Sequence, residues 1–270
     1  MKPRALLITG YGLNCDAETD HALTLAGAAV RRVHLNDLIA DPSELGRSRI
    51  LVIMGGFSYG DHLGAGRALA IRLRHGLVER LTDFVQGGGL VMGVCNGFQV
   101  LCKLGLLPGF DPPARQPAQL ATLTHNDCGV FRDSWVRLRV NADSPCVFTR
   151  GLERLELPVR HGEGKFVVAD RSVLDRLAEG GQVVYRYADA DYKPTMNFPD
   201  NPNGSVDAIA GVCDPTGRIF GSMPHPEAFH RPEHHPDFQR RRALGQPPPE
   251  PLGLRLFQNA VAWAGEHATP

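Results

Sequence analysis

The stretch GGGLVMGVCNGFQ, residues 87–99, decides how this chain of 270 residues folds. An apolar run, residues 90–94, leads directly into Cys95, and the residues after the stretch have the composition of a helix. A sharp turn from strand to helix that carries a nucleophile needs small flanking residues, because a Cβ there would clash with the neighbouring backbone. Gly93 and Gly97 occupy these two positions. The stretch therefore predicts a nucleophile elbow in an α/β fold.

The expected helix would also influence the chemistry of Cys95. The positive end of its backbone dipole would point at the sulfur and favour the thiolate, which is the nucleophilic form of cysteine. A cysteine in a glycine-rich turn can equally be a buried and inert packing residue. The local pattern leaves both interpretations open, so other motifs have to decide between them.

Two further apolar runs end in glycine and are followed by helical patterns. Residues 5–9 lead to Gly10, and residues 50–54 lead to a pair of glycines. Continuous apolar strands separated by helices indicate a parallel sheet that is covered on both faces. We therefore predict an α/β fold with a mostly parallel central sheet and helices on both faces. In such sheets the site lies beyond the carboxyl ends of the strands, so both loops should converge with Cys95 on one crevice.

The second half of the chain is less regular. Residues 135–140 and 183–187 alternate as half-exposed strands do, and residues 208–223 have the pattern of a hairpin. These segments predict an antiparallel extension or a return layer. Residues 229–251 are rich in His, Pro and Arg and predict a loop insertion, after which residues 252–266 resume as a terminal helix.

The composition excludes several classes of protein. The chain carries 29 Lys and Arg against 29 Asp and Glu, so no net field attracts nucleic acid or an anionic membrane. No apolar stretch approaches the roughly 20 residues of a membrane span. The 6 cysteines lack the C-x-x-C spacing of zinc ribbons, and they are too widely spread for a disulfide framework. With 43% hydrophobic residues, we expect one domain that spans residues 1–270. Since no membrane span is predicted, we expect it to be cytoplasmic.

A nucleophilic cysteine needs a base, and the base needs an orienting partner. Two His-x-Glu pairs are available, His225 with Glu227 and His161 with Glu163. The prolines around His225 exclude regular helix, and in an extended segment residues two apart face the same side, so Glu227 can orient the His225 ring. The second pair lies in a glycine-rich loop that could wrap a substrate. Either pair alone is more often an ordinary surface pair.

Several motifs in this order resemble one known family. GVCNGFQ (residues 93–99) with PHPE (224–227) closely resembles class I, triad-type glutamine amidotransferases. Five more motifs are similar to the glutaminase subunits of phosphoribosylformylglycinamidine synthase, namely GLNCD (12–16), GGFSYGD (55–61), HGEGKF (161–166), NGS (203–205) and IAGV (209–212). The similarity runs from residue 5 to about residue 228 and resumes in the last helix.

The resemblance implies a flavodoxin-like fold and assigns the triad. Cys95 would be the nucleophile, His225 the general acid and base, and Glu227 the residue that orients it. The reaction would be hydrolysis of L-glutamine through a γ-glutamyl thioester, with ammonia as the useful product. A separate ATP-dependent synthetase, in some complexes joined by a small accessory subunit, would use this ammonia to convert formylglycinamide ribonucleotide to formylglycinamidine ribonucleotide in purine biosynthesis.

The same resemblance gives roles to the surrounding residues. The backbone around Gly55 and Gly56 and the amide of Asn96 would form the oxyanion hole, and Gln99 would help to hold glutamine. The other matched positions would form the pocket or the rim that faces the partner: Phe57, Ser58, Tyr59, Asp61, His161 and Glu163. For His161 and Glu163 a purely structural role is the alternative. Cys15 has no obvious base beside it, so we expect a packing or loop residue.

No cofactor or metal site is expected in this chain. Lys165 is followed by Phe166, where a phosphate-binding loop needs Ser or Thr, so ATP and magnesium are expected in the partner synthetase. His230, His234 and His235 have a spacing that superficially suits a metal, but no Cys or carboxylate set completes a site, and a solvated loop is the better interpretation. The chain departs from the family pattern at Met54 and Ala228, and the latter puts the local partner contacts in doubt.

Three alternatives stay open. A glutaminase subunit could serve a different acceptor, because the triad recognises glutamine and not the destination of the ammonia. A cysteine hydrolase of the DJ-1/PfpI-like group shares the elbow, although its nucleophile is commonly followed by histidine, where this chain has Asn96. A non-catalytic subunit that keeps the fold for binding would be expected to lack a triad member, and none is lacking here.

Overall fold

The centre of the molecule is a nine-stranded sheet with the order β2-β1-β3-β4-β11-β10-β9-β6-β7. The computed structural model describes residues 2–110 and 118–267 of the chain. One half of the sheet is parallel and contains β1 (Arg4–Thr9), β2 (Ala29–His34), β3 (Ile50–Ile53), β4 (Leu90–Val94) and β11 (Ile219–Ser222). The parallel core confirms the predicted α/β class.

The other half of the sheet is antiparallel, as the alternating segments predicted. It contains β10 (Ile209–Cys213), β9 (Val183–Ala188), β6 (Arg132–Val140) and β7 (Arg154–His161). The sheet as a whole is therefore mixed, because the hairpin of β10 and β11 reverses the strand direction at its middle.

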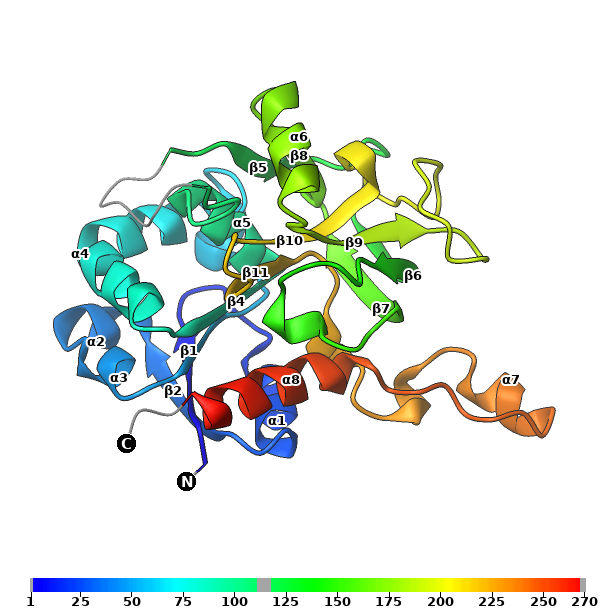
Figure 1. The fold of residues 1–270 in the computed structure, drawn as a ribbon, viewed down its shortest axis with the longest axis horizontal. Coiled ribbons are helices and arrows are strands. Elements are labelled where there is room, and N and C mark those ends of the chain that lie inside the picture. Colours follow the sequence, from blue (N-terminus) through cyan, green and yellow to red (C-terminus); the bar gives the residue numbers. More distant parts are fainter. Residues whose placement is uncertain (1, 111–117, 268–270) are drawn as a thin grey trace.

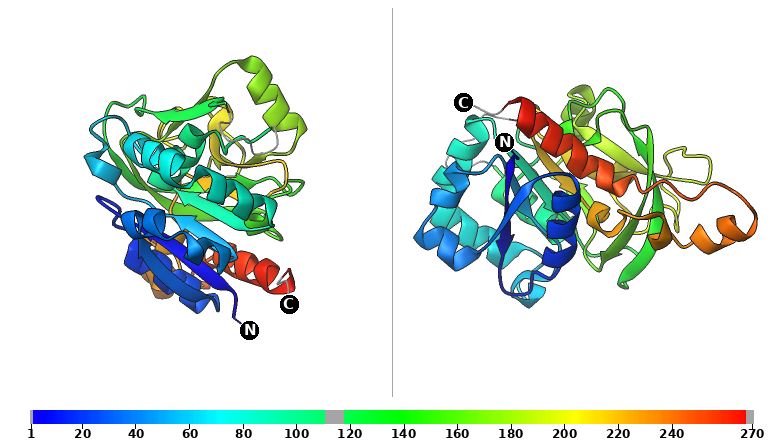
Figure 2. Two further views of the ribbon diagram at one scale, coloured as in Figure 1. Left: turned by 90° about the vertical axis from the view of Figure 1, so that its left-hand side faces the viewer. Right: turned by 90° about the horizontal axis from the view of Figure 1, so that it is seen from below.

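Helices cover both faces of the parallel half (Figures 1 and 2). One face carries α1 (Asp16–Leu25) and α8 (Gly253–Glu266), which contact each other. The opposite face carries α2 (Leu35–Ala40), α3 (Ser43–Gly46), α4 (Arg67–Gln86) and α5 (Asn96–Leu104). Strands β3 and β4 lie between these layers and are buried along their whole length, which explains their continuous apolar sequence.

Shorter elements complete the fold. A two-stranded sheet of β5 (Ala121–Thr124) and β8 (Lys165–Val168) packs on α5, and α6 (Arg171–Glu179) follows β8. Single 3₁₀ turns are η1 (Ser58–Asp61), η2 (Val147–Thr149), η3 (Val206–Ala208) and η4 (Pro226–Ala228). Within the described ranges, no helix combines the length and the apolar character that crossing a membrane requires.

The segment expected to be a solvated loop is more structured than predicted. It contains η5 (Pro232–His234) and α7 (Phe238–Ala243), which extend away from the sheet in Figure 1. His235 is buried, and its Nε2 lies 2.7 Å from Oε2 of Glu156 on β7. The ring also packs against Trp135, with ring centroids 4.6 Å apart. The insertion is therefore anchored to the antiparallel half by His235, which the sequence placed in a solvated loop.

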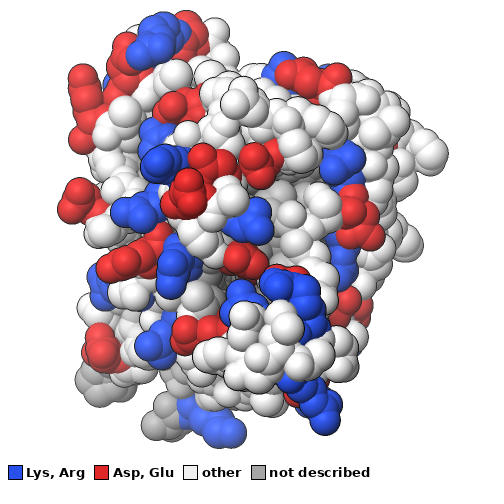
Figure 3. Space-filling model, turned by 90° about the vertical axis from the view of Figure 1, so that its right-hand side faces the viewer, with Lys and Arg blue, Asp and Glu red and all other residues white. Residues whose placement is uncertain are grey.

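The face that includes this antiparallel end carries charges of both signs. In Figure 3, Lys and Arg side chains are interspersed with Asp and Glu over the visible surface. The mixture matches the equal numbers of basic and acidic residues in the sequence.

Candidate active site

Cys95 stands at the predicted elbow between β4 and α5. Its backbone has φ 51° and ψ −103°, a strained conformation for a residue with a side chain. A Cβ on Gly93 would lie 2.6 Å from the carbonyl oxygen of Gly97, and a Cβ on Gly97 would overlap the carbonyl oxygen of Ile53. Both flanking glycines are therefore required by the close approach of β3 and α5, as the sequence predicted.

The His225 and Glu227 side chains form a buried pair below this elbow. Nδ1 of His225 lies 2.6 Å from Oε1 of Glu227, and both side chains are almost completely buried. The backbone amide of His225 donates to the carbonyl of Pro158 on β7, 2.8 Å away, which fixes the segment after β11. Glu227 reaches the ring from the 3₁₀ turn η4 and not from an extended segment, because Pro226 begins that turn.

The geometry leaves the other ring nitrogen available. Nε2 of His225 is buried and makes no hydrogen bond of good geometry in the described part of the chain, although the Cys95 thiol lies within its reach. Burial alone would lower the pKa of His225, but the Glu227 carboxylate and the neighbouring thiols outweigh it and raise that pKa well above its ordinary value. The Sγ atom of Cys95 also lies 3.7 Å from the carbonyl oxygen of Arg160, which bounds the site on the β7 side.

Cys15 is the unexpected member of this cluster. Its thiol is buried and lies within hydrogen-bonding reach of the same His225 ring. A Cβ added to Gly55 would lie 2.8 Å from Cε1 of His225 and 3.1 Å from Sγ of Cys15, so all three residues meet at one point. Burial raises the pKa of Cys15, which keeps it a neutral thiol. Cys15 is packed in the buried core as expected, but the expectation that no base lies beside it was wrong, because β1 brings this loop beside the triad.

The glycine loop after β3 packs tightly on the loop that contains Cys15. Gly56 has φ 142°, and a Cβ there would lie 2.6 Å from the carbonyl oxygen of Gly12. The two loops exchange backbone hydrogen bonds, from Phe57 to Gly12 and from Asn14 to Gly55. These bonds use the amides of Asn14 and Phe57 and not that of Gly56. The arrangement is compatible with the predicted oxyanion role of Gly56.

Asn96 and Gln99 begin α5 and tie three loops together. Nδ2 of Asn96 donates to Asp61, 3.1 Å away, and to Oε1 of Gln99, 3.0 Å away. Nε2 of Gln99 in turn donates to the carbonyl oxygen of Glu163, 2.6 Å away. Oε2 of Glu163 accepts from the amide of Ala65. Both ends of the Gln99 side chain are thus used within the protein, where the side chain holds the Glu163 loop against α5. Its expected role in holding glutamine stays a prediction.

Asp61 closes the same side of the site. Its carboxylate accepts from the amide of Gly66 and from Asn96, and its own backbone has φ 53°. Burial raises the pKa of Asp61. The Asp61 carboxylate is therefore held against the nucleophile helix.

His161, predicted for the pocket or the partner rim, is buried and therefore does not face a partner. It is 2% exposed, and its Nδ1 lies 3.1 Å from Oδ1 of Asn126. Its Nε2 faces Nδ2 of Asn203 at 3.5 Å, and Asn203 also donates to the hydroxyl of Tyr187. Burial lowers the pKa of His161 to about 3, so the ring is neutral at ordinary pH. These contacts give His161 a structural role in holding the loops together, and a role of His161 in the pocket stays a prediction.

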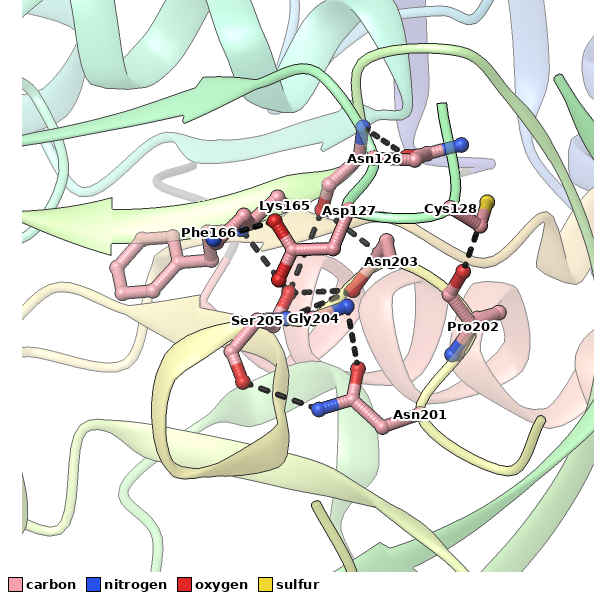
Figure 4. Close-up of polar contacts among 11 residues, drawn as sticks. Asn126, Asp127, Cys128, Lys165, Phe166, Asn201, Pro202, Asn203, Gly204 and Ser205 are labelled. Atoms are coloured by element: carbon pink, nitrogen blue, oxygen red, sulfur yellow. Dashed lines mark hydrogen bonds and ion pairs between the residues drawn. The ribbon is translucent and has the colours of Figure 1, made fainter. Parts of the chain in front are cut away.

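The surrounding polar network joins three loops, as Figure 4 shows. Asn126 donates to the carbonyl of His161 at 2.9 Å. Lys165 pairs with Asp127 at 2.6 Å. Ser205 accepts from the amide of Phe166 at 2.9 Å, and Asn201 donates to the carbonyl of Ser205 at 3.1 Å. The HGEGKF and NGS motifs thus meet in space and hold the Glu163 loop against α5.

The remaining predicted rim residues divide into two groups. The Phe57 side chain is 47% exposed, contacts the ring of Phe131 and is available to a partner. Tyr59 is partly buried and has φ 56°. Ser58 is 1% exposed and therefore does not face a partner, while its alternative place in the pocket stays a prediction. The turn η1 points this hydroxyl inward, where it has no hydrogen-bond partner in the described part of the chain.

The described residues contain one group with spacing suited to a metal ion, formed by Cys15, His225 and Glu227 with their ligand atoms within 4.8 Å of one another. A hydrogen bond already occupies the facing atoms of His225 and Glu227, so the group has the arrangement of an acid–base pair. His230 and His234 pack edge to face and direct their Nδ1 atoms at backbone carbonyls. They do not form a second group of this kind within the described ranges.

Comparison with known proteins agrees with this geometry. Residues 2–264 match the family model of the CobB/CobQ-like glutamine amidotransferase domain. The chain is 46% identical to the "Phosphoribosylformylglycinamidine synthase subunit PurQ" of Dehalococcoides mccartyi, over 97% of this chain and 98% of that protein. It is 41% identical to the subunit of the same name from Methanococcus maripaludis, over 97% of each chain. The solved structure of PurLQS from Thermotoga maritima is similar with a TM-score of 0.69 and 30% identity, over 97% of this chain and 99% of that one.

Proposed function

Because the chain belongs to the CobB/CobQ-like glutamine amidotransferase family and, within it, to the PurQ subunits of phosphoribosylformylglycinamidine synthase, we propose that it hydrolyses L-glutamine to supply ammonia. The acceptor is formylglycinamide ribonucleotide, which a separate ATP-dependent synthetase converts to formylglycinamidine ribonucleotide. One observation carries the chemistry, namely the strained Cys95 within reach of the buried His225–Glu227 pair.

The first half-reaction forms a thioester. Nε2 of His225 takes the proton of the Cys95 thiol, and the sulfur attacks the side-chain carbonyl carbon of glutamine. The amides of Gly56 and Asn96 stabilise the oxyanion that forms on the carbonyl oxygen. His225 then gives its proton to the leaving nitrogen, and ammonia departs from the γ-glutamyl thioester. The raised pKa of His225 suits this role, because the ring must hold a proton between the two steps.

The second half-reaction restores the enzyme. His225 takes a proton from water, and the resulting nucleophile attacks the thioester carbonyl. The carbon–sulfur bond breaks, glutamate is released, and the proton returns to Cys95. Glu227 accepts the Nδ1–H bond throughout, so the imidazole keeps one orientation and one tautomer.

Access to Cys95 supports dependence on a partner. The residue is 5% exposed, and the Gly55–Gly56 loop and the Glu163 loop are both held against it by hydrogen bonds. We infer that docking of the synthetase at exposed side chains such as Phe57 opens the site to glutamine. We also propose that ATP and magnesium bind to the synthetase and not to this chain, and that the complex, with or without a small accessory subunit, works in the cytoplasm.

A labelling experiment tests the proposed nucleophile and substrate together. The full chain, with and without the synthetase, is treated with a diazoketone analogue of glutamine, and the modified residue is mapped by mass spectrometry. We expect modification of Cys95 that excess glutamine prevents, and no modification of the partly exposed Cys128. Labelling that spreads over several cysteines and ignores glutamine, even in the complex, would contradict the proposal.

The variant Cys95→Ala distinguishes a catalytic role of Cys95 from a structural one. It should abolish synthesis that depends on glutamine, because no thioester can form. Synthesis from added ammonia should continue, because the synthetase does not need the thiol. Equal loss of both activities would mean that Cys95 has a structural role only.

A further inference from the structure

A cavity lined by cationic and apolar side chains lies on the flank of the nucleophile helix, outside the site described above. Its volume is about 490 Å³, and it lies between α4, the carboxyl end of α5 and β5. It is lined by Arg67, Ala70, Ile71, Arg74, Lys103, Gln119 and Thr122. In the left panel of Figure 2, α4 lies on the side of the molecule that faces the viewer. Among the described residues, the lining contains three cations and no carboxylate.

The sequence of α4 explains why the cations converge. Arg67 and Arg74 are seven residues apart, so they lie on one face of the helix, with Ala70 and Ile71 between them. The small Ala70 side chain leaves a hollow between the two guanidinium groups. Lys103 enters the hollow from the last turn of α5.

The charges of these side chains are poorly compensated within the described ranges. Nζ of Lys103 donates to a neutral acceptor, Oγ1 of Thr122, at 3.3 Å. Nη2 of Arg74 donates to the backbone carbonyl of Lys103 at 2.6 Å. The negative carboxyl end of the α5 dipole thus compensates the charge of Arg74 and part of the charge of Lys103. Arg67 has no hydrogen bond or ion pair from its side chain in that part of the chain.

The surroundings of Lys103 disfavour its charged form. Burial lowers the pKa of Lys103, and the positive charge of Arg67 lowers it further. The acidic groups that act on it, Glu163 and Asp61, belong to the glutamine site and have hydrogen-bond partners there. A bound anion would remove the repulsion among the three cations.

We propose that this cavity is a binding site for a small molecule that carries a phosphate group. Arginine offers a planar set of donors that suits tetrahedral oxyanions, and two arginines with a lysine can contact several phosphate oxygens at once. The cavity is larger than a bare ion and falls in the range of small-molecule sites. Gln119 and Thr122 provide polar contacts for the rest of the ligand.

Helix α5 connects the cavity to the glutamine site. Lys103 lies one helical turn after Gln99, whose side chain holds the Glu163 loop. An occupied cavity would therefore stabilise the carboxyl half of α5, where that turn begins. The proposal does not depend on the identity of the reaction, because it rests on the charges and shape of this flank.

Binding is tested on the full chain with inorganic pyrophosphate, by calorimetric titration and by thermal unfolding at constant ionic strength. We expect saturable binding and a rise in Tm that sodium chloride at the same ionic strength does not produce. Ribose 5-phosphate should bind and ribose should not, because the phosphate group carries the recognition. Equal effects of pyrophosphate and chloride on Tm would overturn the proposal.

Matched variants locate the site. Arg67→Gln and Lys103→Gln should each weaken binding of pyrophosphate about tenfold or more, since a hydrogen bond to a charged group contributes about 1.5–3 kcal/mol. Arg80→Gln, on an exposed position of the same helix, should bind as the unchanged chain does. Arg67 is exposed, so its variant is expected to fold even if the Lys103 variant does not. Unchanged affinity in Arg67→Gln would contradict the proposed site.

The same variants distinguish a small-molecule ligand of the cavity from a protein partner that binds there. If the cavity instead received an acidic segment of the synthetase, Arg67→Gln would weaken the complex, and pyrophosphate would compete with assembly. That outcome would replace the proposed ligand. Failure of this site would leave the labelling of Cys95 unaffected, so it can be told apart from failure of the proposed function.

Discussion

The His225 imidazole is held from several sides, and the contact that the sequence missed is Cys15. The thiol and the Cα of Gly55 form the surface against which the ring lies, while Glu227 fixes Nδ1. A ring that is positioned in this way presents Nε2 to Cys95 without a search among rotamers. Cys15 is therefore best described as a positioning residue.

Replacement of Cys15 should affect turnover more than substrate binding. In Cys15→Ala the ring gains freedom, so kcat for glutamine should fall several-fold with little change in KM. The thiol also raises the pKa of His225, so the basic group in the pH–rate profile should titrate at lower pH in the variant. Steady-state kinetics across pH measure both effects. Cys128→Ser is the control, and a Cys15→Ala enzyme with an unchanged pH profile would disprove the positioning role.

Buried His161 makes stability depend on pH. Its pKa of about 3 in the folded chain lies below the ordinary value of 6.5. Between these values the unfolded chain binds a proton that the folded chain does not, so the free energy of unfolding falls as pH decreases from about 6.5 toward 3. We expect His161→Asn to flatten this part of the profile, although it lowers stability at neutral pH through lost hydrogen bonds. Urea unfolding at several pH values measures the slope, and an identical slope in both proteins would rule out His161 as its source.

Among the secondary-structure elements, the elbow between β4 and α5 tolerates least change. A Cβ on Gly97 would overlap the backbone of Ile53 in β3, and no side-chain rotation can relieve a backbone clash. Gly97→Ala should therefore lower the free energy of unfolding by about 3 kcal/mol or more and abolish glutamine hydrolysis. Gly46→Ala in α3 is the control, because nothing lies within 4 Å of its added Cβ. Thermal unfolding of both variants makes the comparison, and near-equal Tm values would contradict the packing argument.

The strand β1 and the loop after it have a less visible role. The loop places Gly12 against Gly56 and Cys15 against His225, so one connection shapes both the oxyanion loop and the triad. This explains why the GLNCD motif belongs with the other site motifs although none of its residues carries out a chemical step.

For the whole molecule, the anchoring of residues 229–251 decides how the antiparallel half is closed. His235 pairs with Glu156 at 2.7 Å, and Tyr192 donates to the same carboxylate at 2.6 Å. These contacts hold the Glu156 pKa below its usual range, even though burial acts in the opposite direction. The insertion is therefore attached by the hydrogen bond between His235 and Glu156 and by aromatic packing, rather than by its many surface arginines.

Loss of this anchor should loosen the insertion without disturbing the triad. His235→Ala removes the ring from between Trp135 and Glu156 and should lower the free energy of unfolding by about 1–3 kcal/mol. Proteolysis within residues 236–251 should become faster, and hydrolysis of glutamine should persist. Glu233→Ala, at an exposed position of the same segment, should leave the cleavage rate as it is. A His235→Ala protein that resists protease as well as the control does would show that the anchor lies elsewhere.

Local rules in the sequence were sufficient for the elbow and the parallel core, whereas the choice of His225 and Glu227 as the partners of Cys95 came from the family resemblance. Glycines at 93 and 97 are required by short-range sterics, and continuous apolar runs report burial on both faces of a strand. The pairing of His225 with Glu227 is also local, since only Pro226 separates them. Its geometry differed from the expected extended segment because the chain turns into η4 at that proline.

Tertiary structure decided the features that depend on segments far apart in the chain. Cys15 meets His225 across 210 positions, and His161 becomes buried because loops at Asn126 and Asn203 close over it. The cationic cavity likewise needs α4, α5 and β5 to be packed together. A sequence pattern records the burial and period of one segment, but it does not record which distant side chains will share a space. That information exists only once the sheet order has set neighbouring loops side by side.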